Sequence, residues 1–132
     1  MIVIDTSAAI ATMFDEEDGH IYDRAMERAS IRLISAATRV ELTFVAEGRK
    51  GDAGRALLDR FLHLTGAEIV AFTPLQADLA SRAFRMYGKG RHAAALNIGD
   101  CFSYALARAT GYPLLFKGND FSQTDMKSAL EG

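Results

Sequence analysis

The sequence predicts an α/β fold in which helices cover both faces of a central parallel sheet. Two observations carry this prediction. Short apolar runs alternate with amphipathic stretches along the whole chain, and the first run, "IVI" at 2–4, is β-branched and uninterrupted. Such a run is typical of a strand buried on both faces, as in a parallel sheet. The alternation of strands with helices then gives a layered α/β arrangement.

The remaining elements follow in chain order. After the first strand, the pattern predicts helices at 7–14 and about 17–29, a strand at 31–35, helices at 37–51 and 52–65, a strand at 68–72, a helix at 74–87, a loop at 89–99, a helix at 100–111 and a strand at 113–116. Thr73 is a suitable N-cap for the helix that Pro74 begins. The acidic residues 15–18 suit a helix N-terminus, where the helix dipole favours negative charge.

Length and composition limit the possible classes. A chain of 132 residues with a 49% hydrophobic content predicts one globular domain over 1–132. No apolar run approaches the ~20 residues of a membrane span, and the acidic residue at position 5 argues against a signal peptide. The absence of such a run predicts no membrane partner. Cys101 is the single cysteine, so no disulfide within the chain is possible, which fits a reducing cytoplasm. The net charge of −2 argues against a simple nucleic-acid coating protein but allows an enzyme that holds phosphate through bound cations.

Carboxylates recur where ligands bind in such folds. Asp5 follows the first predicted strand, Asp120 follows the last, and Asp100 opens the helix before the last strand. Ligands of open α/β sheets bind outside the carboxyl ends of the strands. Each acid also has an ordinary explanation: Asp5 as a helix cap, Asp100 as a favourable helix N-terminal acid and Asp120 as a turn residue. Their convergence at one edge favours a common site.

Glu41 needs a separate argument, because it lies within a helix. It neighbours Phe44 and Val45 on that helix, close to a predicted apolar stripe of Val40, Phe44 and Val45. A carboxylate there is costly unless it is paired or bound to a metal. The alternative is that it extends to solvent or pairs with an arginine such as Arg39 or Arg91.

Four converging carboxylates repel one another and call for a hard divalent cation. Mg²⁺ and Mn²⁺ prefer oxygen ligands of this kind. Sites of this type activate a water molecule and stabilise the leaving oxygen when a phosphodiester is cleaved. The pattern therefore predicts a metal-dependent phosphodiesterase.

Three segments resemble the PIN-domain family, within it the VapC-type toxin ribonucleases of toxin–antitoxin modules. They are "MIVIDTSAAIA", "SAATRVEL" and "GDCFSYALARATGYPLLFKGNDFSQTD". The resemblance implies an α/β/α sandwich around a parallel sheet of about four to five strands. It also implies Mg²⁺- or Mn²⁺-dependent endoribonuclease activity, with Asp5, Glu41, Asp100 and Asp120 as both catalytic residues and metal ligands.

The resemblance extends to supporting residues and partners. It implies that hydroxyls of Thr6 and Ser7 support the metal site and that Asn119 orients the loop of the fourth acid. It implies cleavage of transfer or ribosomal RNA, a homodimer, and inhibition by a VapB-like antitoxin. Relatives often have proline after the histidine of "GRH", where this chain has Ala93, which puts the shape of that loop in doubt.

Basic residues provide a further signal. Lys89, Arg91 and His92 precede Asp100 and either hold RNA phosphates or form a solvated loop. Lys117 either neutralises the acids or is simply exposed. A second set of cations forms either an RNA track or a solvated face: Arg49, Lys50, Arg55 and Arg60.

Two other classes of protein are alternatives to a ribonuclease. A phosphoacceptor receiver domain needs an adjacent acidic pair after the first strand, whereas Thr6 and Ser7 follow Asp5 here. A catalytically silent PIN-like module that only binds RNA or protein is the second alternative, and the intact set of four acids argues against it.

Overall fold

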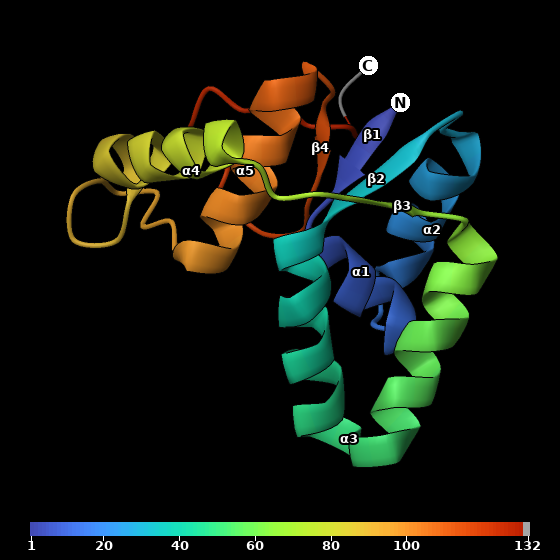
Figure 1. The fold of residues 1–132 in the computed structure, drawn as a ribbon. Coiled ribbons are helices and arrows are strands. Elements are labelled where there is room, and N and C mark those ends of the chain that lie inside the picture. The colour runs from blue at the N-terminus through green and yellow to red at the C-terminus, as the bar shows by residue number, and fades with distance from the viewer. Residues whose placement is uncertain (131–132) are drawn as a thin grey trace.

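A computed structural model describes residues 1–130, and its layered α/β/α arrangement agrees with the prediction (Figure 1). Its elements are β1 Ile2–Ile4, α1 Thr6–Met13, α2 Gly19–Arg28, β2 Arg32–Ser35, α3 Ala36–Thr65, β3 Glu68–Val70, α4 Pro74–Tyr87, α5 Ile98–Thr110 and β4 Leu114–Leu115. The four strands form one parallel sheet in the order β3-β2-β1-β4. In this sheet β1 lies inside and pairs with β4, which lies at one edge.

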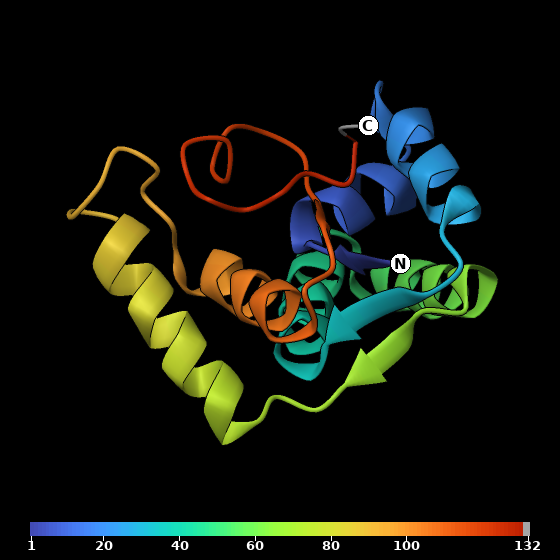
Figure 2. The same ribbon diagram turned by 90° about the horizontal axis from the view of Figure 1, so that it is seen from above.

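Two hydrophobic cores lie on opposite faces of this sheet. Successive strand residues point to opposite faces, so Ile4 and Leu115 join α1, α2 and α3 in one core, whereas Val3 and Leu114 join α4 and α5 in the other. Figure 2 shows these two helical layers on either side of the strands. The buried β1 confirms the interpretation of "IVI" as a strand covered on both faces.

Helix α3 is a helical hairpin rather than one rod. Gly51 has φ 52° and ψ −130°, which breaks the helix into the two arms seen in Figure 1. Only glycine adopts this backbone conformation without strain. The break falls where the sequence predicted the boundary between two helices. A side chain at Gly54 would overlap the backbone carbonyl of Ala46, so glycine there lets the arms approach closely.

The predicted apolar stripe of the first arm was wrong for two of its three residues. Val40 and Phe44 are 53% and 75% exposed, whereas Leu42 and Ala46 are fully buried. Val45 is partly buried and packs against the same core as Leu42 and Ala46. Burial on this arm therefore follows the neighbouring elements rather than side-chain size.

Several boundaries also differ from the prediction. Helix α5 begins two residues earlier than expected, because Asn97 caps it by accepting a hydrogen bond from the backbone N–H of Asp100 (2.9 Å). Strand β3 ends at Val70 rather than at 72 and lies at the exposed edge of the sheet. None of the helices described in residues 1–130 has the length and apolar character that a bilayer crossing requires.

Candidate metal centre and active site

A cavity of about 500 Å³ opens at the carboxyl ends of the strands, and all four predicted acids line it. Asp5 follows β1, Asp120 follows β4, Glu41 lies on the first arm of α3, and Asp100 lies in the first turn of α5. Four distant segments of the chain thus bring their carboxylates to one place, as the parallel topology requires.

Asp5 caps a helix, as the sequence allowed, and it also lines the acidic cavity. It caps α1, since its Oδ2 atom accepts hydrogen bonds from the Ser7 backbone N–H (3.1 Å) and the Ser7 hydroxyl (2.5 Å). The Ser7 hydroxyl oxygen in turn accepts a hydrogen bond from the Lys117 backbone N–H (2.9 Å). Ser7 therefore connects the first acid to the strand end that precedes the fourth. This agrees with the supporting position expected for Ser7.

Glu41 is held by the hydroxyl of Thr6, which follows Asp5 in the chain. The Thr6 hydroxyl donates a hydrogen bond to Oε1 of Glu41, whereas one arginine considered as its partner, Arg39, donates to Thr43 instead. The Glu41 carboxylate also lies against Gly99, where any side chain would overlap it. Glycine in the first turn of α5 therefore makes room for Glu41 in the cavity.

Asp100 is fixed by a capping box at the start of α5. Its Oδ2 atom accepts a hydrogen bond from the Asn97 backbone N–H (3.0 Å), and the Asn97 side chain caps the backbone N–H of Asp100 in return. The Asp100 carboxyl group also lies within hydrogen-bonding reach of the Asp120 carboxyl group. Asn97 was not selected from the sequence, although an asparagine three residues before an acid is a capping-box signal.

Asp120 is presented by a short loop after β4. Gly118, with φ 96°, turns the chain, and both Gly118 and Asp120 line the cavity. Asn119 is exposed and does not line it; its backbone carbonyl accepts a hydrogen bond from the Ser122 hydroxyl (2.7 Å). The hydrogen bond that Asn119 makes in this loop therefore comes from its backbone and not from its side chain.

The acids interact strongly with one another. Burial, together with the neighbouring carboxylates of Asp5 and Asp120, raises the pKa of Asp100 to about 7. Burial also raises the pKa of Asp5 and of Glu41, and the nearby Asp5 carboxylate adds to the effect on Glu41. Burial is thus the main cause of the raised pKa of these three acids, and the neighbouring carboxylates add to it for Asp100 and Glu41.

The two cations of this cavity do not neutralise the four acids. Lys117 forms ion pairs with Glu16 (2.8 Å) and Asp18 (2.9 Å), and these raise its pKa. The acidic stretch 15–18 thus binds Lys117, and no side-chain hydrogen bond from Asp18 caps α2. Arg49 lies over the ring of Phe14, with its Cζ atom 5.2 Å from the ring centroid.

The donor set fits a magnesium-sized cation. Within residues 1–130, no three histidine, cysteine or acidic side chains stand close enough to enclose a metal by themselves. Mg²⁺ does not need such an enclosure, since it usually keeps several waters and binds through one or two carboxylates plus substrate phosphates. Hydrogen bonds from Ser7, Thr6 and Asn97 hold the carboxylates of Asp5, Glu41 and Asp100 in place at the cavity.

The basic loop before α5 lies beside this cavity rather than in it. Lys89 and Arg91 line a neighbouring cavity. His92 lines neither: its Nδ1 atom accepts a hydrogen bond from the Ala94 backbone N–H (3.0 Å), and its ring packs edge-on against Tyr87. His92 therefore has a structural contact that the sequence did not reveal.

Comparison with known proteins identifies the family of this chain. The family model described as the PIN domain matches residues 2–127. The chain belongs to the PIN-domain family. Ribonuclease VapC30 of Mycobacterium tuberculosis is 50% identical to this PIN domain over 125 residues, which cover 95% of each chain. This level of identity places the chain among the VapC ribonucleases of that family, as the resemblance implied.

Solved structures with low sequence identity share the fold of this PIN domain. The sarcin–ricin-loop-cleaving toxin VapC20 of M. tuberculosis matches with a TM-score of 0.77 and 16% identity, covering 96% of both chains. VapBC2 of Rickettsia felis, solved with a DNA fragment from its promoter, matches with a TM-score of 0.72 and 18% identity over 97% of this chain and 96% of that one. These matches confirm the predicted fold class.

Proposed function

We propose that this PIN domain is the toxin of a toxin–antitoxin pair and cleaves RNA as a divalent-metal-dependent endoribonuclease. The observation that carries the proposal is the convergence of Asp5, Glu41, Asp100 and Asp120 in one cavity without a neutralising protein cation. The 50% identity to a protein named a ribonuclease supports the reaction class. The alternative is a catalytically silent binding module. Such a module would not need the hydrogen bonds from Thr6, Ser7 and Asn97 that hold three of these acids in place.

The four acids are the proposed ligands of Mg²⁺ or Mn²⁺. A cation of this kind lowers the pKa of a bound water and stabilises charge on the oxygens of a phosphodiester. The protein's own part is to hold its carboxylates in place: Thr6 orients Glu41, Ser7 orients Asp5 and Asn97 orients Asp100. Asp100 must also lose its proton before it can act as a ligand.

The proposed partners follow from the same site. The substrate is transfer or ribosomal RNA in the cytoplasm, and the inhibitor is a VapB-like antitoxin. We expect that antitoxin to place an arginine at the acidic cavity, because a guanidinium pairs with carboxylates through two hydrogen bonds. A second copy of the chain is the proposed partner of the exposed Val40 and Phe44 on α3.

RNA cleavage by the purified chain, free of antitoxin, tests the proposal. A mixture of transfer and ribosomal RNA is incubated with Mg²⁺ or Mn²⁺, with EDTA as one control. We expect discrete fragments that disappear in EDTA and in Asp5→Asn, and that persist in Asp78→Asn, an exposed acid on α4. Cleavage that continues unchanged in Asp5→Asn would contradict the proposal. Metal binding without cleavage of any RNA would favour the silent binding module.

A further inference from the structure

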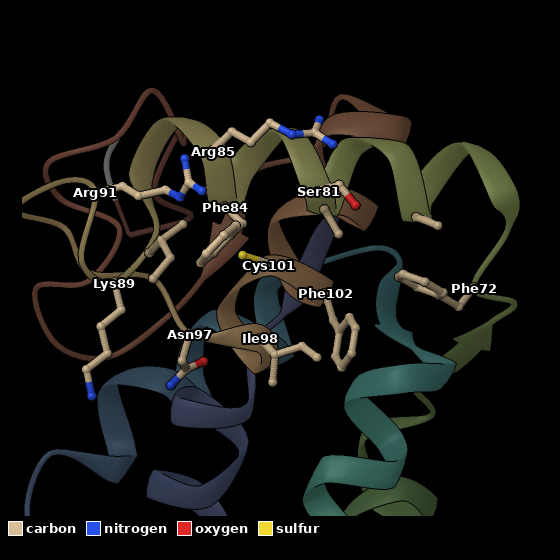
Figure 3. Close-up of a pocket in the computed structure, with 13 residues that line it drawn as sticks. Phe72, Ser81, Phe84, Arg85, Lys89, Arg91, Asn97, Ile98, Cys101 and Phe102 are labelled. Atoms are coloured by element: carbon tan, nitrogen blue, oxygen red, sulfur yellow. The ribbon is translucent and has the colours of Figure 1, made fainter.

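A second cavity, of about 670 Å³, lies beside the acidic one. It opens between α4 and α5, and the loop that joins these helices closes one end (Figure 3). Its volume is within the range of pockets that hold small ligands. None of the roles assigned to the acidic cavity uses it.

Phenylalanine rings form much of its wall. The rings of Phe72 and Phe102 meet edge to face, with centroids 5.2 Å apart and planes at 76°. Phe84 lies across the cavity on α4 and is 42% exposed. Aromatic faces that remain accessible are the surfaces on which unpaired nucleobases stack, and they do so with little dependence on base identity.

Three cations surround these rings, and no carboxylate lines the cavity. Arg85, Lys89 and Arg91 form no ion pair with any acid in residues 1–130, in contrast to the paired Lys117. The Arg91 guanidinium lies over the Phe84 ring, 5.0 Å from its centroid, as Figure 3 shows. A guanidinium held on a ring is already oriented for a phosphate group.

The loop between α4 and α5 connects this cavity to the acidic site. It is closed by hydrogen bonds from the Lys89 backbone N–H to the Leu96 carbonyl (3.0 Å) and from the Leu96 backbone N–H to the Tyr87 carbonyl (2.9 Å). It ends at Asn97, which lines both cavities and holds Asp100. The two cavities are therefore adjacent along a path that one strand of RNA can follow.

We propose that the second cavity binds one unpaired nucleotide of the RNA substrate, next to the bond that is cleaved. The base stacks on Phe102 and lies against the Phe84 ring that Arg91 partly covers, and Arg85 and Arg91 hold the adjoining phosphate. This assignment rests on the proposed ribonuclease function. It implies a preference for unpaired RNA, because a base that is paired in a helix must leave its stack to enter the cavity.

Cleavage kinetics on a single-stranded RNA oligonucleotide provide the first test. The double variant Arg85→Ala, Arg91→Ala and the single variant Phe102→Leu are compared with a control of equal charge change, Arg24→Ala, Arg82→Ala. Both control arginines are exposed and line neither cavity. We expect KM to rise roughly 5- to 100-fold in the cavity variants, with kcat changed less than about twofold, because the cavity holds substrate away from the reacting bond.

Salt dependence separates a phosphate contact from a general loss of folding. For single strands, the slope of log affinity against log salt concentration becomes shallower by about 0.7 for every phosphate that the protein no longer neutralises. We expect that decrease in the arginine double variant and no decrease in Phe102→Leu or in the control. An unchanged slope in the arginine variant would contradict the assignment.

Fluorescence provides a second test that does not need catalysis. The chain contains no tryptophan, so Phe84→Trp introduces a single reporter into the cavity. In an Asp5→Asn background, a stacked base should quench this tryptophan as the oligonucleotide is added. The same oligonucleotide, labelled, measures total binding by anisotropy. Binding without quenching would overturn the proposal.

The outcomes distinguish failure of this inference from failure of the proposed function. Quenching by RNA in a protein that cleaves no RNA would keep the nucleotide site and reject the ribonuclease. Normal cleavage by the arginine double variant, equal to the control, would keep the ribonuclease and reject the nucleotide site. A change of oligomeric state in the cavity variants, with unchanged RNA affinity, would reject the site as well, because a second copy would then cover the cavity.

Discussion

The acidic cavity and its neighbour differ most in charge, although both border the start of α5. Five carboxylates line the first, together with Arg49 and Lys117. No carboxylate lines the second, which has three cations and accessible aromatic rings. We therefore expect the first to repel RNA until a metal ion is bound, and the second to attract RNA without one. This contrast teaches that chemistry and substrate binding are assigned to separate surfaces, with Asn97 between them.

The contrast also explains why Lys117 does not serve the substrate. Its ammonium group is engaged by Glu16 and Asp18 on the loop before α2. The pairing anchors the strand end that precedes Asp120 to the first part of the chain. Lys117 is therefore held in ion pairs at the acidic cavity. Arg85, Lys89 and Arg91 of the second cavity form no such pairs within residues 1–130.

The largest expected effect comes from filling the space that Gly99 leaves for Glu41. In Gly99→Ala, the new methyl group would overlap the Glu41 carboxylate, whose atoms are its nearest neighbours, so we expect it to displace this proposed ligand. We expect Mg²⁺ affinity, measured by calorimetry, to fall by roughly 10- to 100-fold. Gly48→Ala is the matched control, since a side chain there meets nothing within 4 Å. Equal metal affinity in both variants would remove Glu41 from the site.

The pH response of the two cavities should also differ. Because the pKa of Asp100 is raised to about 7 in the folded protein from 3.8, the folded state binds its proton more tightly than the unfolded state. The stability from this group is thus present in full below about pH 4 and is lost as pH rises through 7, by up to about 1.4 kcal/mol per pH unit. Mg²⁺ binding displaces that proton, so affinity should rise up to about tenfold per pH unit and level off above 7.

Thermal unfolding in EDTA between pH 5 and 8 measures the loss of stability, and calorimetry measures the Mg²⁺ affinity. Asp100→Asn should flatten the stability profile, because asparagine can still accept the capping hydrogen bond but cannot titrate. RNA quenching of the tryptophan reporter should stay the same over this range, since no carboxylate lines its cavity. A pH slope that persists unchanged in Asp100→Asn would assign the effect to another group.

The smallest expected effect concerns Arg49, the cation of the acidic cavity that forms no ion pair within residues 1–130. It lies eight residues after Glu41 on the same helical arm, about 12 Å further along the axis. At that distance it can contact a phosphate away from the metal. We expect Arg49→Ala to raise KM about three- to tenfold with kcat unchanged, since phosphate contacts position the substrate. Arg55→Ala, which removes an exposed arginine paired with Glu47, should leave KM unchanged.

The sequence predicted that the four acids converge at one edge of the sheet, and all four do line one cavity, because parallel topology brings the ends of strands together. Asp5 and Asp120 directly follow neighbouring strands, so their meeting needs no knowledge of side-chain packing. Glu41 and Asp100 depend on how helices approach the same edge, and the resemblance to a family supplied that information. The breaks and caps of the helices, such as Gly51 and Thr73, were also visible as local signals.

The second cavity could not be predicted in this way. Phe72, Phe84 and Phe102 come from three different parts of the chain, and only the packing of α4 against α5 brings them together. No spacing in the sequence encodes that contact. The same reason explains the exposed Phe44 and the structural contact of His92, since tertiary neighbours, rather than residue type, decide burial.

The pairing of β1 with β4 makes the acidic cavity depend on segments far apart in the sequence. Asp5 follows β1 and Asp120 follows β4, and β4 pairs with no strand other than β1 among the described residues. A chain that stops before β4 lacks both the partner strand and the fourth acid. We therefore expect the proposed active site to be completed only once β4 has been made and has paired with β1.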